Sequence, residues 1–251
     1  MNILVCVKRV PATGAKIVLT KDEQEIETRH LGFTISPHEE CAVEEAIRLK
    51  EAHGGTTTVL TLGPEAATEQ LRFALAQGID RAVLLETDGS DWGPAATAQA
   101  IVEAIRARPE PFDLLLFGNE SADSGGYQVG IRVAYAFDLP CVTGIKALEI
   151  KNGAAIVKRE FPGGWEVYET PLPAAFMVKE GLNLPRYPSL PGRLRAKKAP
   201  IEQTKPPRRD DGLEKVRLKT LAEQDKGAEV LGRGPEAAPK VVEVLKRVGV
   251  L

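Results

Sequence analysis

Short apolar runs rich in valine, isoleucine and leucine alternate with segments of helical periodicity over the first 140 residues. The apolar runs span residues 3–7, 57–62, 82–85 and 114–117. Continuous runs bounded by turn residues are typical of parallel strands buried on both faces. Helices are predicted between them at residues 36–54, 65–77, 94–108 and 126–137. The alternation predicts right-handed βαβ crossovers and an α/β fold with a doubly wound, Rossmann-like parallel sheet.

The helix that follows residue 36 has the clearest boundary signals. Ser36 is placed as its N-cap and Pro37 as its first residue. Glu39 completes a capping box, which is worth about 1 kcal/mol, and Gly54 is the stop signal. Apolar positions at helical spacing predict one buried face. The charged positions between them are expected to face solvent: Glu44, Glu45, Arg48 and Glu51.

Alternating runs begin after Pro140 and predict an antiparallel addition to the sheet. Two of them flank Lys151-Asn152-Gly153, which is a strong hairpin signal. The segments "WEVYET" and "PAAFMVKE" continue the pattern as strands. We expect all of these strands to extend or cap the sheet at one edge.

Residues 185–212 have the composition of an extended arm. Six prolines in this stretch argue against both a helix and a central strand. Its basic residues could indicate a nucleic-acid patch, but aromatic residues other than Tyr187 are missing, so an arm that wraps a protein partner is favoured. Leu190 would be an exposed apolar anchor for a protein. The predicted domains are 1–184, with the hairpin, and 185–251, which ends in a helix at 237–248.

Composition excludes several classes of function. The net charge of -2 over 251 residues gives no reason to expect nucleic acid or an anionic membrane as partner. Three cysteines without a C-x-x-C pair indicate neither a disulfide framework nor a zinc site. The sequence shows no targeting segment and no apolar run of transmembrane length. We therefore expect a soluble, cytoplasmic protein of bacterial type.

The stretch "FGNESADSGGYQVG", residues 117–130, is the strongest candidate for a ligand site. Its glycines Gly118, Gly125 and Gly126 allow backbone amides to approach an anion, and a helix N-terminus follows. The alternative is a strand-to-helix turn that binds nothing. The first βα turn lacks G-x-G-x-x-G, no Walker lysine motif is present, and "SGGYQV" lacks the Asp and Ser of the ATP pyrophosphatase loop. The loop is therefore expected to hold a phosphate without cleaving it.

Residues for catalysis or metal binding are scarce. The three histidines, His30, His38 and His53, form no H-x-x-x-H pair. His30 and His53 are expected at the surface, whereas His38 sits at the ligand end of the sheet, with an exposed position at the helix start as the default. Cys6 is favoured as a core residue over a nucleophile. The sequence therefore predicts a binding protein without catalytic or metal-ligating residues.

Five segments of the chain are specific enough to compare with known families: "CVKRVP", "SPHEECAVEEAIRLKE", "LGPEAATEQLRFALAQGIDRAVLL", "VKREFPGGWEVYETPLPA" and "LNLPRYPSLPGRLRAKKAPIE". Together they resemble the small, beta subunit of electron-transferring flavoproteins, in that family's order and spacing. The most specific is Val157 to Ala174, where Pro162 replaces a usual acidic residue in a surface turn. The resemblance weakens after about residue 210.

The resemblance implies an electron-carrier subunit in a heterodimer with an alpha subunit that holds most of one FAD. It implies acyl-CoA or related dehydrogenases as partners, with Leu190 as the docking residue. Thr13 and His38 occupy the flavin-proximal positions, where some relatives carry aromatic residues. The family's contacts to an AMP without redox role fall on Cys6, Ser36, Pro37, His38, Glu39, Leu62, Gly118, Asn119, Glu120, Ser121, Ala122, Asp123, Ser124, Gly125, Gly126, Tyr127, Gln128 and Val129.

Two alternatives stay open at this point. One is a family member that bifurcates electrons and holds a second FAD in the beta pocket. AMP is favoured over it because the serine-rich loop suits a short phosphate. The other is a free-standing adenine-nucleotide sensor of the stress-protein type, for which a long C-terminal arm would have little use.

Overall fold

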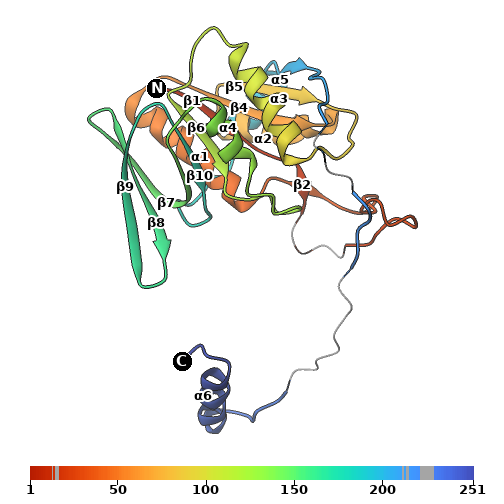
Figure 1. Ribbon diagram of the computed structural model, residues 1–251, viewed down its shortest axis with the longest axis vertical. Coiled ribbons are helices and arrows are strands. Elements are labelled where there is room, and N and C mark those ends of the chain that lie inside the picture. Colours follow the sequence, from red (N-terminus) through yellow and green to blue (C-terminus); the bar gives the residue numbers. More distant parts are fainter. Residues whose placement is uncertain (13, 15–16, 211, 213–214, 221–228) are drawn as a thin grey trace.

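The computed structural model describes residues 1–12, 14, 17–210, 212, 215–220 and 229–251. A nine-stranded sheet runs through it in the order β11-β5-β4-β1-β6-β10-β7-β8-β9 (Figure 1). The strands are β1 (Asn2–Cys6), β4 (Thr56–Gly63), β5 (Arg81–Glu86), β6 (Leu114–Gly118), β7 (Cys141–Lys151), β8 (Ala154–Phe161), β9 (Gly164–Pro171), β10 (Ala174–Val178) and β11 (Glu202–Thr204). Two short strands, β2 (Val10–Pro11) and β3 (Phe33–Thr34), pair separately.

The helices confirm the predicted alternation. They are α1 (Pro37–His53), α2 (Thr68–Gln77), α3 (Pro94–Arg106), α4 (Val129–Ala136), α5 (Leu190–Lys198) and α6 (Ala238–Arg247), with 3₁₀ turns η1 (Glu65–Ala67) and η2 (Pro235–Ala237). The strands from β11 to β7 are parallel to their neighbours, and β8 and β9 are antiparallel additions. The fold is a doubly wound α/β sheet, as predicted.

The expectation that all strands after residue 140 lie at one edge is wrong for β10. The predicted hairpin is present as β7 and β8, and β9 forms the edge. β10, however, inserts between β6 and β7 and runs parallel to both. All five of its residues are buried. A short run that is apolar throughout fits an interior strand with helices on both faces, so its composition outweighs its place next to the hairpin.

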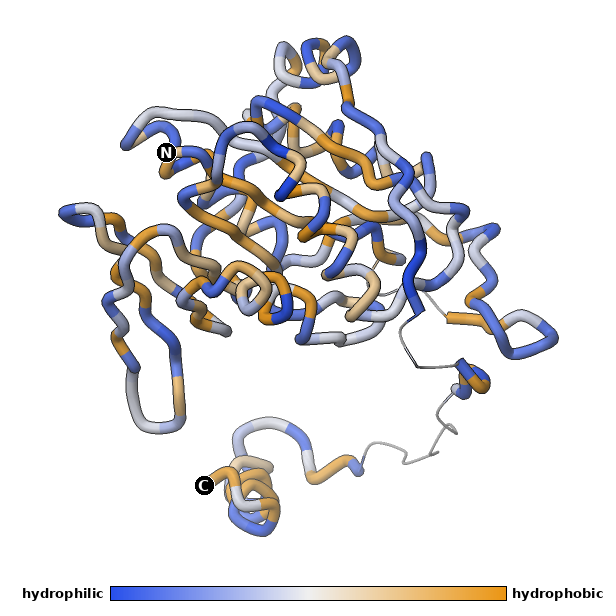
Figure 2. Tube along the Cα trace, turned by 45° about the horizontal axis from the view of Figure 1, so that its top comes forward, coloured by the Kyte–Doolittle hydropathy of each residue, from blue (hydrophilic) through white to orange (hydrophobic). Residues whose placement is uncertain are grey.

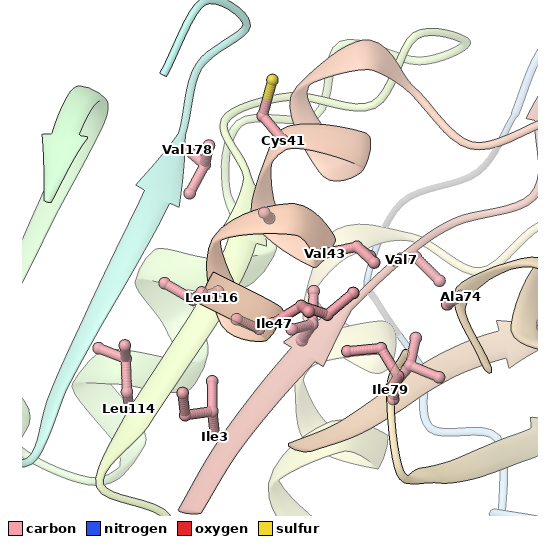
Figure 3. Close-up of a cluster of buried hydrophobic side chains, with 14 of the residues drawn as sticks. Ile3, Val7, Cys41, Val43, Ile47, Ala74, Ile79, Leu114, Leu116 and Val178 are labelled. Carbon is pink, nitrogen blue, oxygen red and sulfur yellow. The ribbon is translucent and has the colours of Figure 1, made fainter. Parts of the chain in front are cut away.

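Two hydrophobic clusters lie on opposite faces of the sheet. Along β1, Ile3 and Val5 face a cluster with α1 and α2, and Leu4 and Cys6 face a cluster with α3 and α4. Figure 3 shows Ile3 and Leu116 meeting Ile47 of α1 in the first cluster. Figure 2 shows the hydrophobic stretches gathered in the central strands. Successive side chains of a strand point to opposite faces, which is why a continuous apolar run serves both.

Helix α1 has the predicted boundaries, but its solvent face was predicted wrongly at two positions. The capping box of Ser36 and Glu39 is formed, and Gly54 ends the helix. Glu44 and Glu45, expected in solvent, are 2% and 7% exposed. The segment after β10 lies across α1 and covers both, with Arg186 bound to Glu44 and Asn183 bound to Glu45.

The expectation of a helix-free arm is also wrong within residues 185–205. Ser189 caps α5, and Pro191 occupies its first turn, where a proline displaces no intrahelical hydrogen bond. β11 pairs with β5 and forms the edge of the sheet, a position that the prediction did not exclude. Prolines in the first turn of a helix or between elements do not prevent α5 or β11 from forming. The number of prolines alone is therefore not a reason to exclude a helix.

The last helix, α6, buries none of its residues. Val241 and Val242 of its apolar face are 42% and 41% exposed. The predicted amphipathic helix is therefore present, and its apolar side is uncovered in this single chain. Among the described residues, none of the helices combines the length and the apolar character needed to cross a membrane.

Candidate functional site

The candidate site lies where strands β1 and β6 end side by side. Cys6 and Phe117 are paired at the carboxyl ends of the two strands. The chain leaves β1 toward β4 on one side and returns from β5 to β6 on the other, which makes this the switch point of the sheet. Doubly wound sheets bind ligands in the crevice outside such a point. The loops after β1 and β6 and the start of α1 form its walls.

Glu39 ties these three walls together. Its carboxylate accepts the backbone N–H of Lys8 (3.0 Å) and the backbone N–H of Ser36 (3.0 Å). Gly118 lies against it, and a Cβ at that position would come 2.7 Å from the Glu39 Cγ. Position 118 therefore requires a glycine for reasons of space. Glu39 fixes the loop after β1, the N-cap of α1 and the first residue after the apolar part of β6.

Hydrogen bonds occupy the Glu39 carboxylate and burial keeps the Cys6 thiol protonated, so neither is free to act as a base or a nucleophile. Burial raises the pKa of Glu39 to about 7, although the N–H groups of Ser36 and Lys8 oppose this shift. Each of its oxygens already accepts a backbone hydrogen bond. Burial also raises the pKa of Cys6 well above its usual range, and the nearby Glu39 charge adds to this. Cys6 is 7% exposed, as predicted for a core residue.

Lys8 reaches across the mouth of the crevice to the loop after β6. Its Nζ lies 2.7 Å from Asp123 Oδ2 and 3.4 Å from Ser124 Oγ. The hydroxyls of Ser121 and Ser124 are 2.9 Å apart. Burial acts to raise the pKa of Asp123, but the Lys8 ammonium outweighs it and the pKa lies below its usual value. One cation, its partner carboxylate and two hydroxyls thus converge at this opening.

Sequence reasoning missed Lys8. Its signal was its position, because it is the second residue after the strand that borders the switch point. A cation there is directed to the ligand edge of a doubly wound sheet regardless of any glycine motif. Lys8 belongs to no phosphate-binding sequence motif, so a motif alone does not identify it.

Helix α4 begins three residues later than predicted. Gly125 and Tyr127 have positive φ values of 58° and 40°, which a right-handed helix does not tolerate, and α4 starts at Val129. No side chain caps its N-terminus. Its first-turn N–H groups are therefore not satisfied by a capping side chain. Gly126 has an ordinary φ and room for a Cβ, so unlike Gly118 it is not required by the backbone or by packing.

His38 is a bridging residue, and the default of an exposed helix-start residue was wrong. Its side chain is 14% exposed. The backbone N–H of Glu180 donates to Nδ1 (2.7 Å), so the proton of the neutral ring is on Nε2, which donates to Glu120 Oε1 (3.2 Å). His38 thus joins the start of α1 to the loops after β6 and β10.

The remaining predicted residues divide between the crevice and other places. Asn119 anchors the loop after β6 through its N–H to the carbonyl of Val178 (2.8 Å). Leu62 is half-buried inside β4, one strand away from the switch point, rather than after the strand. Leu190 begins α5 and does not belong to the crevice. Thr13 lies outside the described residues, so its proximity to a flavin stays a prediction.

A hollow of about 290 Å³ borders the loop after β6 and is lined by Asn119 and Tyr127 together with residues of α4, β7 and β8. Arg159 in its wall is held by Glu166 (Nε to Oε2, 2.7 Å), a pair from the segment that carried the family resemblance. The side chains that line this hollow are other than Lys8, Ser121 and Ser124.

Comparison with known proteins shows the family of the chain. Residues 25–208 match the model of the electron transfer flavoprotein domain. The chain belongs to the electron transfer flavoprotein family. It is 38% identical over 253 residues to the electron transfer flavoprotein subunit beta of Bacillus subtilis, a match that covers 98% of both chains.

Other beta subunits of electron transfer flavoproteins are similar over shorter stretches. That of Syntrophomonas wolfei is 41% identical over 202 residues, or 80% of this chain and 78% of the relative. That of Thermoanaerobacterium thermosaccharolyticum is 37% identical over 194 residues, or 76% and 73%. The resemblance to the beta subunit seen in the sequence is confirmed. The match to the electron transfer flavoprotein domain, residues 25–208, runs from β3 to β11 and includes neither β1 and β2 nor α6.

Proposed function

We propose that this chain is the small subunit of a heterodimeric electron carrier. It pairs with an alpha subunit that holds most of one FAD, and the complex carries electrons from acyl-CoA or related dehydrogenases to a downstream acceptor. Bound FAD supplies the redox chemistry, and the protein holds and orients it. The crevice at the switch point holds an AMP that takes no part in electron transfer. The observation that carries the proposal is the convergence of Lys8, Ser121 and Ser124 at that crevice in a chain of this family.

The residues of the crevice fit an adenylate. The Lys8 ammonium and the two serine hydroxyls match the charge and the acceptor oxygens of a phosphate. The uncapped start of α4 adds N–H groups and the positive end of a helix dipole. Gly118 brings the loop against Glu39 at a place where any side chain would intrude. The two helix starts differ in this respect. The N-terminus of α1 is capped by Ser36 and Glu39, whereas no side chain caps the N-terminus of α4, which leaves its N–H groups for a ligand.

The same residues suit retention better than reaction. Glu39 has both oxygens engaged by backbone N–H groups, and Cys6 is a buried thiol with a raised pKa. His38 is held at both ring nitrogens. This chain is therefore a binding and docking subunit without substrate chemistry of its own.

The bound nucleotides test the proposal directly. The chain is co-expressed with an alpha subunit, the heterodimer is purified, and the nucleotides released on denaturation are identified by mass spectrometry. One FAD and one AMP per heterodimer are expected. Two FAD and no AMP would favour the bifurcating alternative. A heterodimer with neither nucleotide would refute the proposal.

Leu190 is proposed to dock onto the dehydrogenases. It is 71% exposed at the start of α5, and an exposed leucine on a fixed helix end is a suitable anchor for an apolar pocket. Leu190→Ala is expected to keep the FAD content while it slows reduction by a dehydrogenase. Val167→Ala, at a 59% exposed position on β9, is the matched control. Equal rates in the two variants would contradict the docking role.

The C-terminal segment is proposed to wrap the alpha subunit. The apolar side of α6 is uncovered in the single chain. An amphipathic helix of ten residues is not stable in water without a surface to pack on. The partner subunit of the heterodimer supplies that surface.

A further inference from the structure

Three exposed apolar side chains precede or begin α5: Leu184, Tyr187 and Leu190, which are 84%, 92% and 71% exposed. We name residues 184–190 the docking segment, since it contains the residue proposed to contact the dehydrogenases. Loops with such exposed side chains are commonly mobile, and a mobile loop loses affinity when binding orders it. How this segment is held therefore matters for recognition.

Arg186 fixes the middle of the docking segment to α1. Its Nε donates to Glu44 Oε2 (2.9 Å) and its Nη2 to Glu44 Oε1 (3.1 Å), in a bidentate pair. The Nη1 donates to Glu51 Oε1 (2.6 Å), and the Arg186 backbone N–H also donates to Glu44 (3.1 Å). The side chain of Gln77 in α2 binds the Arg186 carbonyl (2.9 Å). One residue of the segment thus bonds to two helices.

The C-terminal end of the segment is fixed independently through α5. A Cβ at Gly192 would overlap the carbonyl oxygen of Ala76, so α5 lies in direct backbone contact with α2. Arg72 of α2 donates to the carbonyl of Ala196 (2.6 Å) at the end of α5. Between this anchor and Arg186, the exposed Tyr187 and Leu190 are carried on a short span stiffened by prolines.

The Arg186 clamp joins a buried carboxylate to a guanidinium that is 35% exposed. Glu44 is 2% exposed, although its position on α1 would suit solvent. Burial acts to raise its pKa, but the bonds from Arg186 hold the pKa below its usual value, so the pair is ionised. Burying an ion pair costs desolvation that the attraction barely offsets. Such pairs are retained in some proteins because they specify one arrangement.

We propose that Arg186 is the positioning residue of the docking segment. Its pair with Glu44 presents Tyr187 and Leu190 in one preformed arrangement to an apolar pocket on the dehydrogenase, and so lowers the KM for docking. Arg186 does not touch the flavin or the partner's reacting atoms. The proposal rests on the proposed docking function.

The test uses the FAD-loaded heterodimer as the electron acceptor of a purified acyl-CoA dehydrogenase. Arg186→Met removes the charge and keeps the length. It is expected to raise KM about tenfold, the size expected for ordering a few side chains, and to leave kcat within about twofold. Hydrogen exchange of residues 181–190 is expected to accelerate. Glu51→Gln, which removes only the half-exposed outer pair, is the control and should change KM by less than about twofold.

Conservative rescue separates positioning from folding. Arg186→Lys keeps a cation over Glu44 but loses the bidentate geometry, and should raise KM about threefold. If the Arg186→Met chain does not assemble into a heterodimer, Arg186→Lys is the variant that tests the proposal. An unchanged KM in Arg186 variants, while Leu190→Ala is impaired, would overturn this proposal alone. A fall in kcat at unchanged KM would also overturn it. If Leu190→Ala itself transfers electrons at the parent rate, the docking function fails instead.

Discussion

The three glycines of the loop after β6 provide a graded test of the crevice. Gly118→Ala places a Cβ 2.7 Å from Glu39 Cγ, and either the loop or the Glu39 side chain must move. Overpacking of this kind costs about 1 to 3 kcal/mol, and a weakened hydrogen bond to a charged acceptor costs about 1.5 kcal/mol more. We expect a loss of about 3 kcal/mol in the free energy of unfolding.

Alanine at the two neighbouring glycines is expected to cost less of the free energy of unfolding. Gly125 has a φ of 58°, so alanine there costs about 1 kcal/mol of backbone strain. Gly126 has an ordinary φ and no atom closer than 3.9 Å to a new Cβ, so Gly126→Ala should stay within about 0.5 kcal/mol. The expected loss of stability is therefore largest at position 118, where a Cβ lacks space, smaller at position 125, where φ is positive, and smallest at position 126.

The measurement is the thermal unfolding midpoint of the purified heterodimer, together with its AMP content. In a domain of this size each kcal/mol lowers the midpoint by about 2 to 4 °C. Gly118→Ala should therefore lower it by about 6 to 12 °C and reduce retained AMP, and Gly126→Ala should change neither. If Gly126→Ala lowers the unfolding midpoint and the AMP content as much as Gly118→Ala does, the contact between Gly118 and Glu39 does not shape the crevice.

Three further predictions address separate parts of the molecule. Because the folded pKa of Glu39 is raised from 4.5 to about 7, its favourable contribution is present at low pH and is lost as the pH rises. From about pH 5 to about pH 8 the parent should lose about 2 to 3 kcal/mol relative to Glu39→Gln in urea unfolding, and a constant difference would contradict the burial argument. Lys8→Met should lower the AMP retained by the heterodimer about tenfold or more through the loss of one charge-assisted contact, whereas Lys158→Met on the hairpin should not. Replacing both Val241 and Leu245 by Asp should weaken assembly with the alpha subunit in size-exclusion chromatography, and an unchanged complex would refute docking by α6.

Local patterns predicted the elements whose causes are local. The capping box of Ser36 and Glu39 satisfies backbone groups within one turn, so α1 could be placed to the residue. Lys151-Asn152-Gly153 places the hairpin because a tight turn needs positive φ at Asn152 and Gly153, and both have it. The parallel strands followed from apolar runs that are buried on both faces.

Other features depended on what packs against them. Glu44 and Glu45 occupy polar positions of α1, yet a segment 140 residues later in the chain buries them. α5 forms in a proline-rich stretch because Ser189 caps it and α2 gives it a surface. β10 lies inside the sheet because it pairs with β6 on one side and with β7 on the other. No local window contains these partners.

The candidate site divides in the same way. The sequence by itself determined the fold class and, through its spaced segments, the family, and it singled out the loop 117–130 as the candidate ligand loop. Only the tertiary structure decided that Lys8 spans the mouth, that Gly118 is required and Gly126 is not, and that His38 is a bridge. The physical reason is distance along the chain. Caps, turns and periodicity act within a few residues, whereas the crevice is assembled from loops about 30 and 110 residues apart by the crossover connections of the sheet.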